Sequence, residues 1–199
     1  MSYMIRAERL CDADNLLVSQ NQGVNSTFIQ VFNTFDIQNS QFTNNTVLGY
    51  FDLLSDIYFL NVSITEIKCV KQCFILNSIQ AKKVVFEVLK MSNVVLNGDG
   101  FMIKQSSNVT IRLQNSYFDK ITQLKDLDGE AYGKMMIFDH LKYSKIKWID
   151  TNFTQIKSMI YFHLERGNVM FKTIRFYQFD SSQDSLIDFH LQKTKVEYR

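Results

Sequence analysis

The stretch Ile146-Lys147-Trp148-Ile149-Asp150-Thr151-Asn152-Phe153-Thr154-Gln155-Ile156 shows the pattern on which most of the chain is built. Apolar Ile146 and Trp148 alternate with polar residues, which is the period of a strand with one buried face. A second apolar pair, Phe153-x-x-Ile156, follows directly. The pattern predicts two short strands in succession, with Trp148 facing the core.

Segments that begin in the same way recur along the chain. They start at Phe35, Ile57, Val84, Val109, Ile146 and Val169, and a seventh start appears at Val196. Successive starts lie 22, 27, 25, 37, 23 and 27 residues apart, and the long step contains an insertion at 122–134. Most units close with a third apolar–polar segment, which is clearest at 137–141, 160–164 and 187–191.

Three short strands per unit predict an all-β fold, a right-handed parallel β-helix. We expect about 6–7 coils of 22–27 residues, because one coil cannot bury its own inner face whereas stacked coils share a continuous core. The β-helix is expected over residues 16–199, preceded at 1–15 by an N-terminal cap or extension in the form of a short helix. Because 195–199 look like the start of another coil, we expect a longer chain or assembly in which other protein segments cover an open C-terminal end.

The recurring unit resembles that of the pectate-lyase-like superfamily of right-handed parallel β-helices, and the resemblance covers roughly residues 16–199. This superfamily includes polysaccharide lyases, pectin hydrolases and esterases, tailspikes, adhesins and surface proteins. The pectin hydrolases carry the strings Asn-Thr-Asp, Asp-Asp, Gly-His-Gly and Arg-Ile-Lys, and none of these occurs here. The resemblance therefore implies a non-catalytic member.

All three histidines of the chain, His140, His163 and His190, fall three residues after the first isoleucine of a closing strand. Stacked coils would place them in a column with rungs about 4.8 Å apart. Alternation turns the isoleucines, Ile137 among them, inward and the histidines outward. Phe138, Tyr161 and Asp188 are expected on the same outer face.

Two interpretations of the histidine column remain open. Neutral imidazoles bind zinc or copper, so the column with Asp188 is a candidate site for a metal, an anion or carbohydrate. The alternative is a ladder of like side chains with no ligand.

The insertion contains three carboxylates in five residues, Asp126, Asp128 and Glu130. Calcium prefers such oxygen clusters, and binding residues often lie on loops. The full calcium-loop pattern is absent, so a solvated acidic loop is the alternative. No motif requires a cofactor, and calcium or zinc is a possible bound ion.

Two further features concern the cellular compartment. Acceptor sequons for N-glycosylation occur at Asn25, Asn44, Asn61, Asn108 and Asn152, which favours an extracellular or cell-surface protein. Cys69 and Cys73 are spaced for a local disulfide, with buried free thiols as the alternative. An intracellular location stays open.

Charge and hydropathy exclude some partners. The net charge is +2, with 22 basic and 20 acidic residues interspersed, so the sequence predicts no nucleic-acid partner. No apolar run approaches the roughly 18 residues of a membrane span.

The sequence therefore favours a non-catalytic structural or recognition module of a surface protein, with carbohydrate as a candidate ligand. One alternative is a carbohydrate-active lyase or hydrolase that draws its acid and base from His140, His163, Asp126, Asp128 and Asp188. A second alternative is an intracellular assembly subunit. Converging carboxylates in one groove would favour the enzyme.

Overall fold

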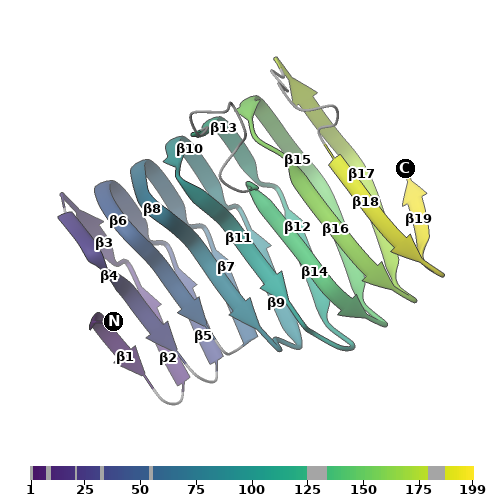
Figure 1. Ribbon diagram of the computed structural model, residues 1–199, viewed down its shortest axis with the longest axis horizontal. Helices are drawn as coiled ribbons and strands as arrows, with labels where there is room; N and C mark the ends of the chain where they lie inside the picture. Colours follow the sequence, from purple (N-terminus) through teal and green to yellow (C-terminus); the bar gives the residue numbers. More distant parts are fainter. Residues whose placement is uncertain are drawn as a thin grey trace.

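The computed structural model describes residues 2–7, 10–20, 22–31, 34–53, 56–124, 134–178 and 187–199. These residues form an all-β solenoid in which every strand pairing is parallel. The strands lie side by side as successive rungs, and the two termini lie at opposite ends of the stack (Figure 1). The described residues therefore form a parallel β-solenoid.

Three series of strands line the solenoid, and each coil contributes one strand to each series. The first series is β2 (Leu10–Asp14), β5 (Thr34–Gln38), β7 (Asp56–Leu60), β9 (Lys83–Glu87), β12 (Thr110–Gln114), the first parts of β15 (Lys145–Lys157) and β17 (Asn168–Tyr177), and β19 (Lys195–Tyr198). The second is β3 (Leu17–Ser19), the first parts of β6 (Gln41–Leu53) and β8 (Ser63–Ile79), β10 (Lys90–Leu96), β13 (Tyr117–Gln123), and the second parts of β15 and β17. The third is β1 (Ser2–Ala7), β4 (Gln22–Val31), the second parts of β6 and β8, β11 (Gly98–Lys104), β14 (Met136–Lys142), β16 (Ile160–Glu165) and β18 (Ile187–Gln192).

The core is a set of columns in which like side chains stack from coil to coil. Phe118, Phe153 and Phe176 stack with ring centroids 4.9 and 5.0 Å apart. Trp148 is fully buried, as predicted, and its ring centroid lies 5.5 Å from those of Phe153 and Phe162. Parallel pairing in register brings identical positions one rung apart, so the repeat in the sequence becomes a continuous apolar interior.

The corners of the coils use residues in the left-handed backbone region instead of glycine. Asn15, Asn39 and Asn61 begin a column of such residues between the first and second strand series, with φ of 56°, 47° and 54°. Asparagine tolerates this region because its short side chain can hydrogen-bond locally. The Asn61 Nδ2 atom donates to the Asn39 Oδ1 atom at 2.9 Å, which links adjacent coils. The chain therefore turns sharply without any proline.

The corner after the third series changes position partway along the solenoid. The last paired residue of β11 is aligned with one residue of β8 and one residue of β14. Each of these three residues is followed by a residue with positive φ, namely Gln80, Gln105 and His140. In the later coils the left-handed residue instead follows the position aligned with Lys142, at Tyr143, Arg166 and Lys193. The coils that contain β11 and β14 carry both kinks, at Gln105 and Asn108 in the first and at His140 and Tyr143 in the second.

Several predictions need correction. Residues 2–7 and 10–14 are strands of the solenoid, paired with β4 and β5, in place of the helix predicted over 1–15. The repeat predicted a strand start at Val109, but the residue in register with Val84 is Ile111, two residues further along the chain.

No helix among the described residues is long and apolar enough to cross a membrane.

Candidate functional site

The histidines lie on three consecutive coils of the third strand series, on β14, β16 and β18. His163 and His190 are directly in register. All three side chains are exposed to solvent, at 63% for His140, 40% for His163 and 59% for His190, which agrees with the predicted outward orientation. Their surroundings nevertheless differ.

A β-bulge breaks the regular column at β14. Phe138 pairs with Phe162 and Leu141 pairs with Leu164, so Asp139 and His140 together lie opposite the single residue His163. His140 has φ of 53°, in the left-handed region that it shares with the aligned corner residues Gln80 and Gln105. Bulges of this kind leave an extra residue unpaired and redirect side chains.

The bulge corrects two predicted orientations. Met136, and not Ile137, is in register with Ile160. Phe138 therefore faces the core, where it stacks on Phe162 at 4.8 Å, instead of lying beside the histidines. Ile137 pairs with Tyr161 in the column that continues to Asp188, although it is itself buried.

Asp139 is the centre of the site, and it was not predicted. Its Oδ1 atom lies 2.8 Å from the Nδ1 atom of His140 and 3.1 Å from the Nδ1 atom of His163. The imidazole centroids of these two histidines are 4.5 Å apart. Burial opposes ionisation of the Asp139 carboxyl, but hydrogen bonds and charge from the two imidazoles outweigh it and lower its pKa. A carboxylate and two imidazoles thus form one cluster.

His190 lies outside this cluster. Its ring centroid is 6.4 Å from that of His163, and its Nε2 atom lies 3.2 Å from the Oδ2 atom of Asp188. The spacing along the histidine column is therefore uneven, and the column divides into a pair with Asp139 and a single residue with Asp188.

Tyr161 lies on the same face and responds to both carboxylates. Burial and the negative charges of Asp139 and Asp188 raise the pKa of its hydroxyl. The Nζ atom of Lys134 lies 3.8 Å from the centroid of the Tyr161 ring, a cation–π contact. Burial is the largest cause of the raised pKa, and the two carboxylates add to it.

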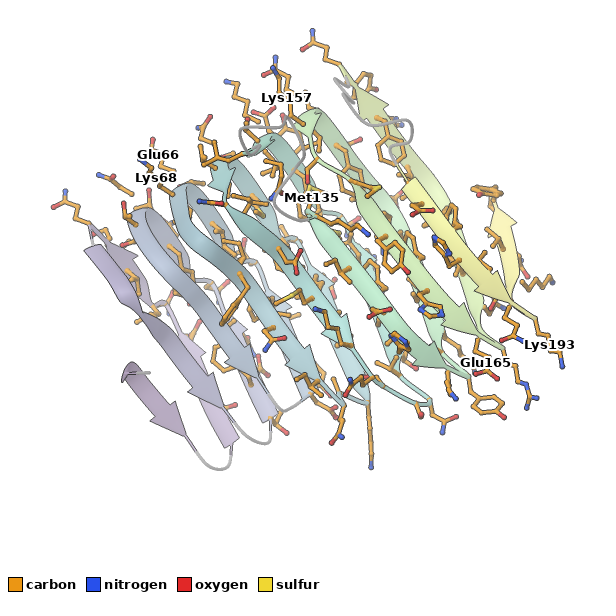
Figure 2. The ribbon with its side chains drawn as sticks, in the orientation of Figure 1. Glu66, Lys68, Met135, Lys157, Glu165 and Lys193 are labelled. Carbon is orange, nitrogen blue, oxygen red and sulfur yellow. The ribbon has the colours of Figure 1, made fainter. Side chains whose placement is uncertain are left out.

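A shallow hollow of about 170 Å³ adjoins the cluster. Its wall includes His140, His163 and Glu165. Glu165 is held by the Nζ atom of Lys142 at 3.2 Å and lies at the end of β16, at the same corner of the solenoid as Lys193 (Figure 2). The hollow leaves room for water or a small ligand beside the two imidazoles.

The structure places the other predicted site residues as follows. Asn44, Asn61 and Asn108 are exposed at corners, and Asn152 is half-buried within β15. Asn25 lies in β4, and Cys69 and Cys73 both lie in β8. Asp126, Asp128 and Glu130 lie outside the described residues, so the predicted calcium loop stays a prediction.

The fold and this cluster define a class of protein, a parallel β-solenoid with a histidine–carboxylate group on one outer face. No protein-family model matches the chain, and neither the curated proteins nor the solved structures include a significant match.

Proposed function

We propose that the chain is a non-catalytic structural and recognition module of a surface or extracellular protein. Its coils would wind as a right-handed parallel β-helix of the pectate-lyase-like type. The observation that carries the proposal is the continuous stack of parallel strands around one apolar core, which presents long, regular outer faces. Solenoids of this kind use such extended faces for binding.

The placement of carboxylates shows where a glycan-cleaving activity, the alternative to this proposal, would have to lie. Glycoside hydrolysis commonly uses two carboxyl groups about 5–9.5 Å apart on either side of the bond to be broken. Glu165 lines the hollow beside His163, and Asp139 adjoins this hollow through its contacts with His140 and His163. The hollows lined by Asn39, Asn61 and Lys90, and by the aromatic residues at the C-terminal end, contain no carboxylate side chain.

The exposed sequons support the extracellular part of the proposal. Asn44, Asn61 and Asn108 project at corners of the solenoid, where a glycan would not enter the core. Asn61 already donates to Asn39, so a glycan there would replace one link between coils. We therefore expect occupancy at Asn44 and Asn108 before Asn61.

The recognition role includes protein segments that add to the C-terminal coil. Within the described residues, β18 pairs only with β16 and β19 pairs only with β17. An apolar hollow of about 410 Å³ at this end is lined by Trp148, Phe171, Ile174 and Tyr198 among others. An extended protein segment with alternating apolar residues fits both features, because it supplies strand hydrogen bonds and fills the hollow.

A polysaccharide screen tests the proposal against the enzymatic alternative. The full chain is incubated with acidic and neutral polysaccharides, with and without Ca²⁺ or Zn²⁺, and reducing ends and unsaturated products are measured. We expect binding to some polysaccharides and no turnover. Turnover that is lost in the Asp139→Asn variant would overturn the proposal and favour the lyase or hydrolase.

Mass spectrometry of the native protein tests the compartment. Glycans on Asn44 or Asn108 would support the extracellular assignment. Unmodified sequons together with reduced Cys69 and Cys73 would favour the intracellular assembly subunit instead.

A further inference from the structure

We propose that Asp139, His140 and His163 form a surface site for one divalent transition-metal ion, with zinc as the best-suited ion. The cluster brings together one carboxylate and two imidazoles, and its three ligand atoms all lie within 4.8 Å of one another. Imidazole nitrogen with carboxylate oxygen is a donor set that suits zinc, copper and other first-row ions. This inference does not depend on the proposed function, because a non-catalytic module and an enzyme could both hold such an ion.

Two of the three ligand-atom distances in the cluster are close to those of a zinc site, and the two imidazole nitrogens, which lie within 4.8 Å of each other, would close to the spacing that the ion sets. A tetrahedral zinc ion with bonds of about 2.0–2.1 Å separates its ligand atoms by roughly 3.3 Å. The Asp139 Oδ1 atom is already 2.8 Å from His140 Nδ1 and 3.1 Å from His163 Nδ1. Without metal, the Nδ1–H groups of the imidazoles donate hydrogen bonds to the carboxylate, and a metal ion would take the place of these hydrogen atoms between the nitrogens and the oxygen.

The bulge in β14 creates this convergence. A regular strand would place a single residue opposite His163, whereas the bulge places both Asp139 and His140 there. The left-handed backbone of His140 costs conformational energy, since this region disfavours residues with a Cβ atom. This conformation recurs at corners throughout the solenoid, and at His140 it accompanies the bulge that leaves the His140 ring 4.5 Å from the His163 ring.

The charge around the cluster favours a cation over an anion. Asp139 lies between the two imidazoles, and Asp188 and Glu165 lie on the neighbouring strands. The nearby cations already have partners: Lys142 pairs with Glu165, Lys104 lies 4.0 Å from Asp99, and Lys134 covers the Tyr161 ring. A bound anion would meet the Asp139 carboxylate, whereas a metal cation would be neutralised by it.

The remaining coordination position faces solvent. The hollow of about 170 Å³ beside His140 and His163 can hold water, which completes the coordination of a site with three protein ligands. His190 supplies an internal control, because the same residue type one coil away is paired with Asp188 and lies outside the cluster.

Zinc titration of the full chain tests the site. Binding is measured at neutral pH by competition with a chromophoric chelator, for the wild type and for His163→Gln, Asp139→Asn and His190→Gln. We expect one ion per chain, and a loss of affinity of about a hundredfold or more for His163→Gln and Asp139→Asn, because even changes to partners of metal ligands cost 10–100-fold. His190→Gln should stay within about twofold, because His190 pairs with Asp188 and supplies no ligand atom to the cluster.

A second measurement uses only the wild-type protein and so does not depend on the folding of variants. Imidazole NMR signals are followed during zinc addition, with Ca²⁺ as the control ion. The proposal predicts that two histidines shift together at one equivalent while the third does not, and that Ca²⁺ has no effect. Equal shifts of all three histidines, or equal loss of affinity in His163→Gln and His190→Gln, would overturn it.

Discussion

The strands β16 and β18 present nearly the same apolar residues to the core, yet they differ in burial. Ile160, Phe162 and Leu164 on β16 are fully buried. Their partners in register on β18, Ile187, Phe189 and Leu191, are only half-buried. Local sequence does not explain the difference, because both strands have the pattern Ile-x-Phe-His-Leu.

The difference arises from the neighbours of each strand. β16 has a coil on both sides, β14 and β18, whereas β18 pairs only with β16 within the described residues. In a solenoid the stability of each coil is close to a sum of its own term and the terms of its interfaces with adjacent coils. The same side chain should therefore contribute more in an interior coil than in an end coil.

A matched pair of phenylalanine substitutions gives the largest expected contrast. Phe162→Ala should lower the free energy of unfolding by about 3–5 kcal/mol, since it opens a cavity among buried rings. Phe189→Ala should cost about 1–2 kcal/mol, because its side chain is partly in water already. Urea unfolding followed by far-UV circular dichroism measures both, and equal costs would contradict the dependence on neighbouring coils.

The two described glycines with close neighbours give the next contrast. A Cβ atom at Gly100 would collide with the backbone carbonyl of Met135 on the next coil, and this backbone cannot move without disturbing the stack. Gly100→Ala should therefore cost about 2–3 kcal/mol. At Gly167 the Cβ atom would lie 3.0 Å from the Ser144 carbonyl oxygen, near the C-terminal end.

Gly167→Ala should cost no more than about 1 kcal/mol, because the end coils can shift to relieve the contact. Thermal unfolding of the two variants measures the difference. A larger loss at Gly167 than at Gly100 would show that the end coil is as rigid as the interior.

Buried hydroxyl groups at corners form a third contrast. The Ser116 Oγ atom donates to the Gln114 carbonyl at 2.8 Å and accepts from the Leu89 N–H at 3.2 Å. Ser116→Ala leaves this N–H buried without a partner and should cost about 1–2 kcal/mol. Thr194 makes analogous bonds near the C-terminal end, accepting from the Gly167 N–H and donating to the Gln192 carbonyl.

Thr194→Ala should cost less than about 1 kcal/mol, since water can reach the half-buried position. Equilibrium unfolding in urea compares the two variants. Equal losses would mean that solvent does not replace the threonine hydroxyl.

The sequence predicted the strands of most coils, because the alternation of apolar and polar residues can be recognised even when the exact register is not known. The column through Ile57, Val84 and Ile146 is in register as expected. The error at Val109 went undetected because a shift of two residues keeps every side chain on the same face. Only the hydrogen-bonded register shows that Ile111 occupies that column.

The candidate site was less predictable because it depends on a departure from the repeat. The Ile-x-x-His spacing is identical in all three closing strands, so the sequence suggested an even histidine column. The run Met135-Met136-Ile137-Phe138 is apolar throughout and gives no alternation from which to choose the inward residue. Asp139 beside His140 was the available signal, but only the bulge reveals that it joins His163.

Two carboxylates give the smallest contrast, which appears in the pH dependence of stability. Burial raises the pKa of Asp99 above 3.8, although the Lys134 N–H and nearby lysines partly oppose it. A hydrogen bond from Lys195 instead lowers the pKa of the half-buried Glu197 below 4.5. The interior coil therefore disfavours the ionised form of Asp99, whereas the end coil favours the ionised form of Glu197.

The signs of the two effects are opposite. The folded state holds the Asp99 proton more tightly than the unfolded state, so this residue's contribution to stability falls as pH rises from 3.8 through its raised pKa. Asp99→Asn removes this pH-dependent loss of stability, and the asparagine can still accept the hydrogen bond from the Lys134 N–H. Above the titration range, the free energy of unfolding of the variant should exceed that of the wild type by less than about 1 kcal/mol. Glu197→Gln should instead remove a contribution that is lost as pH falls below 4.5. Urea unfolding of the wild type and both variants from pH 3.5 to 7 measures these slopes, and a variant whose slope changes in the other direction would contradict the assigned environment of that carboxylate.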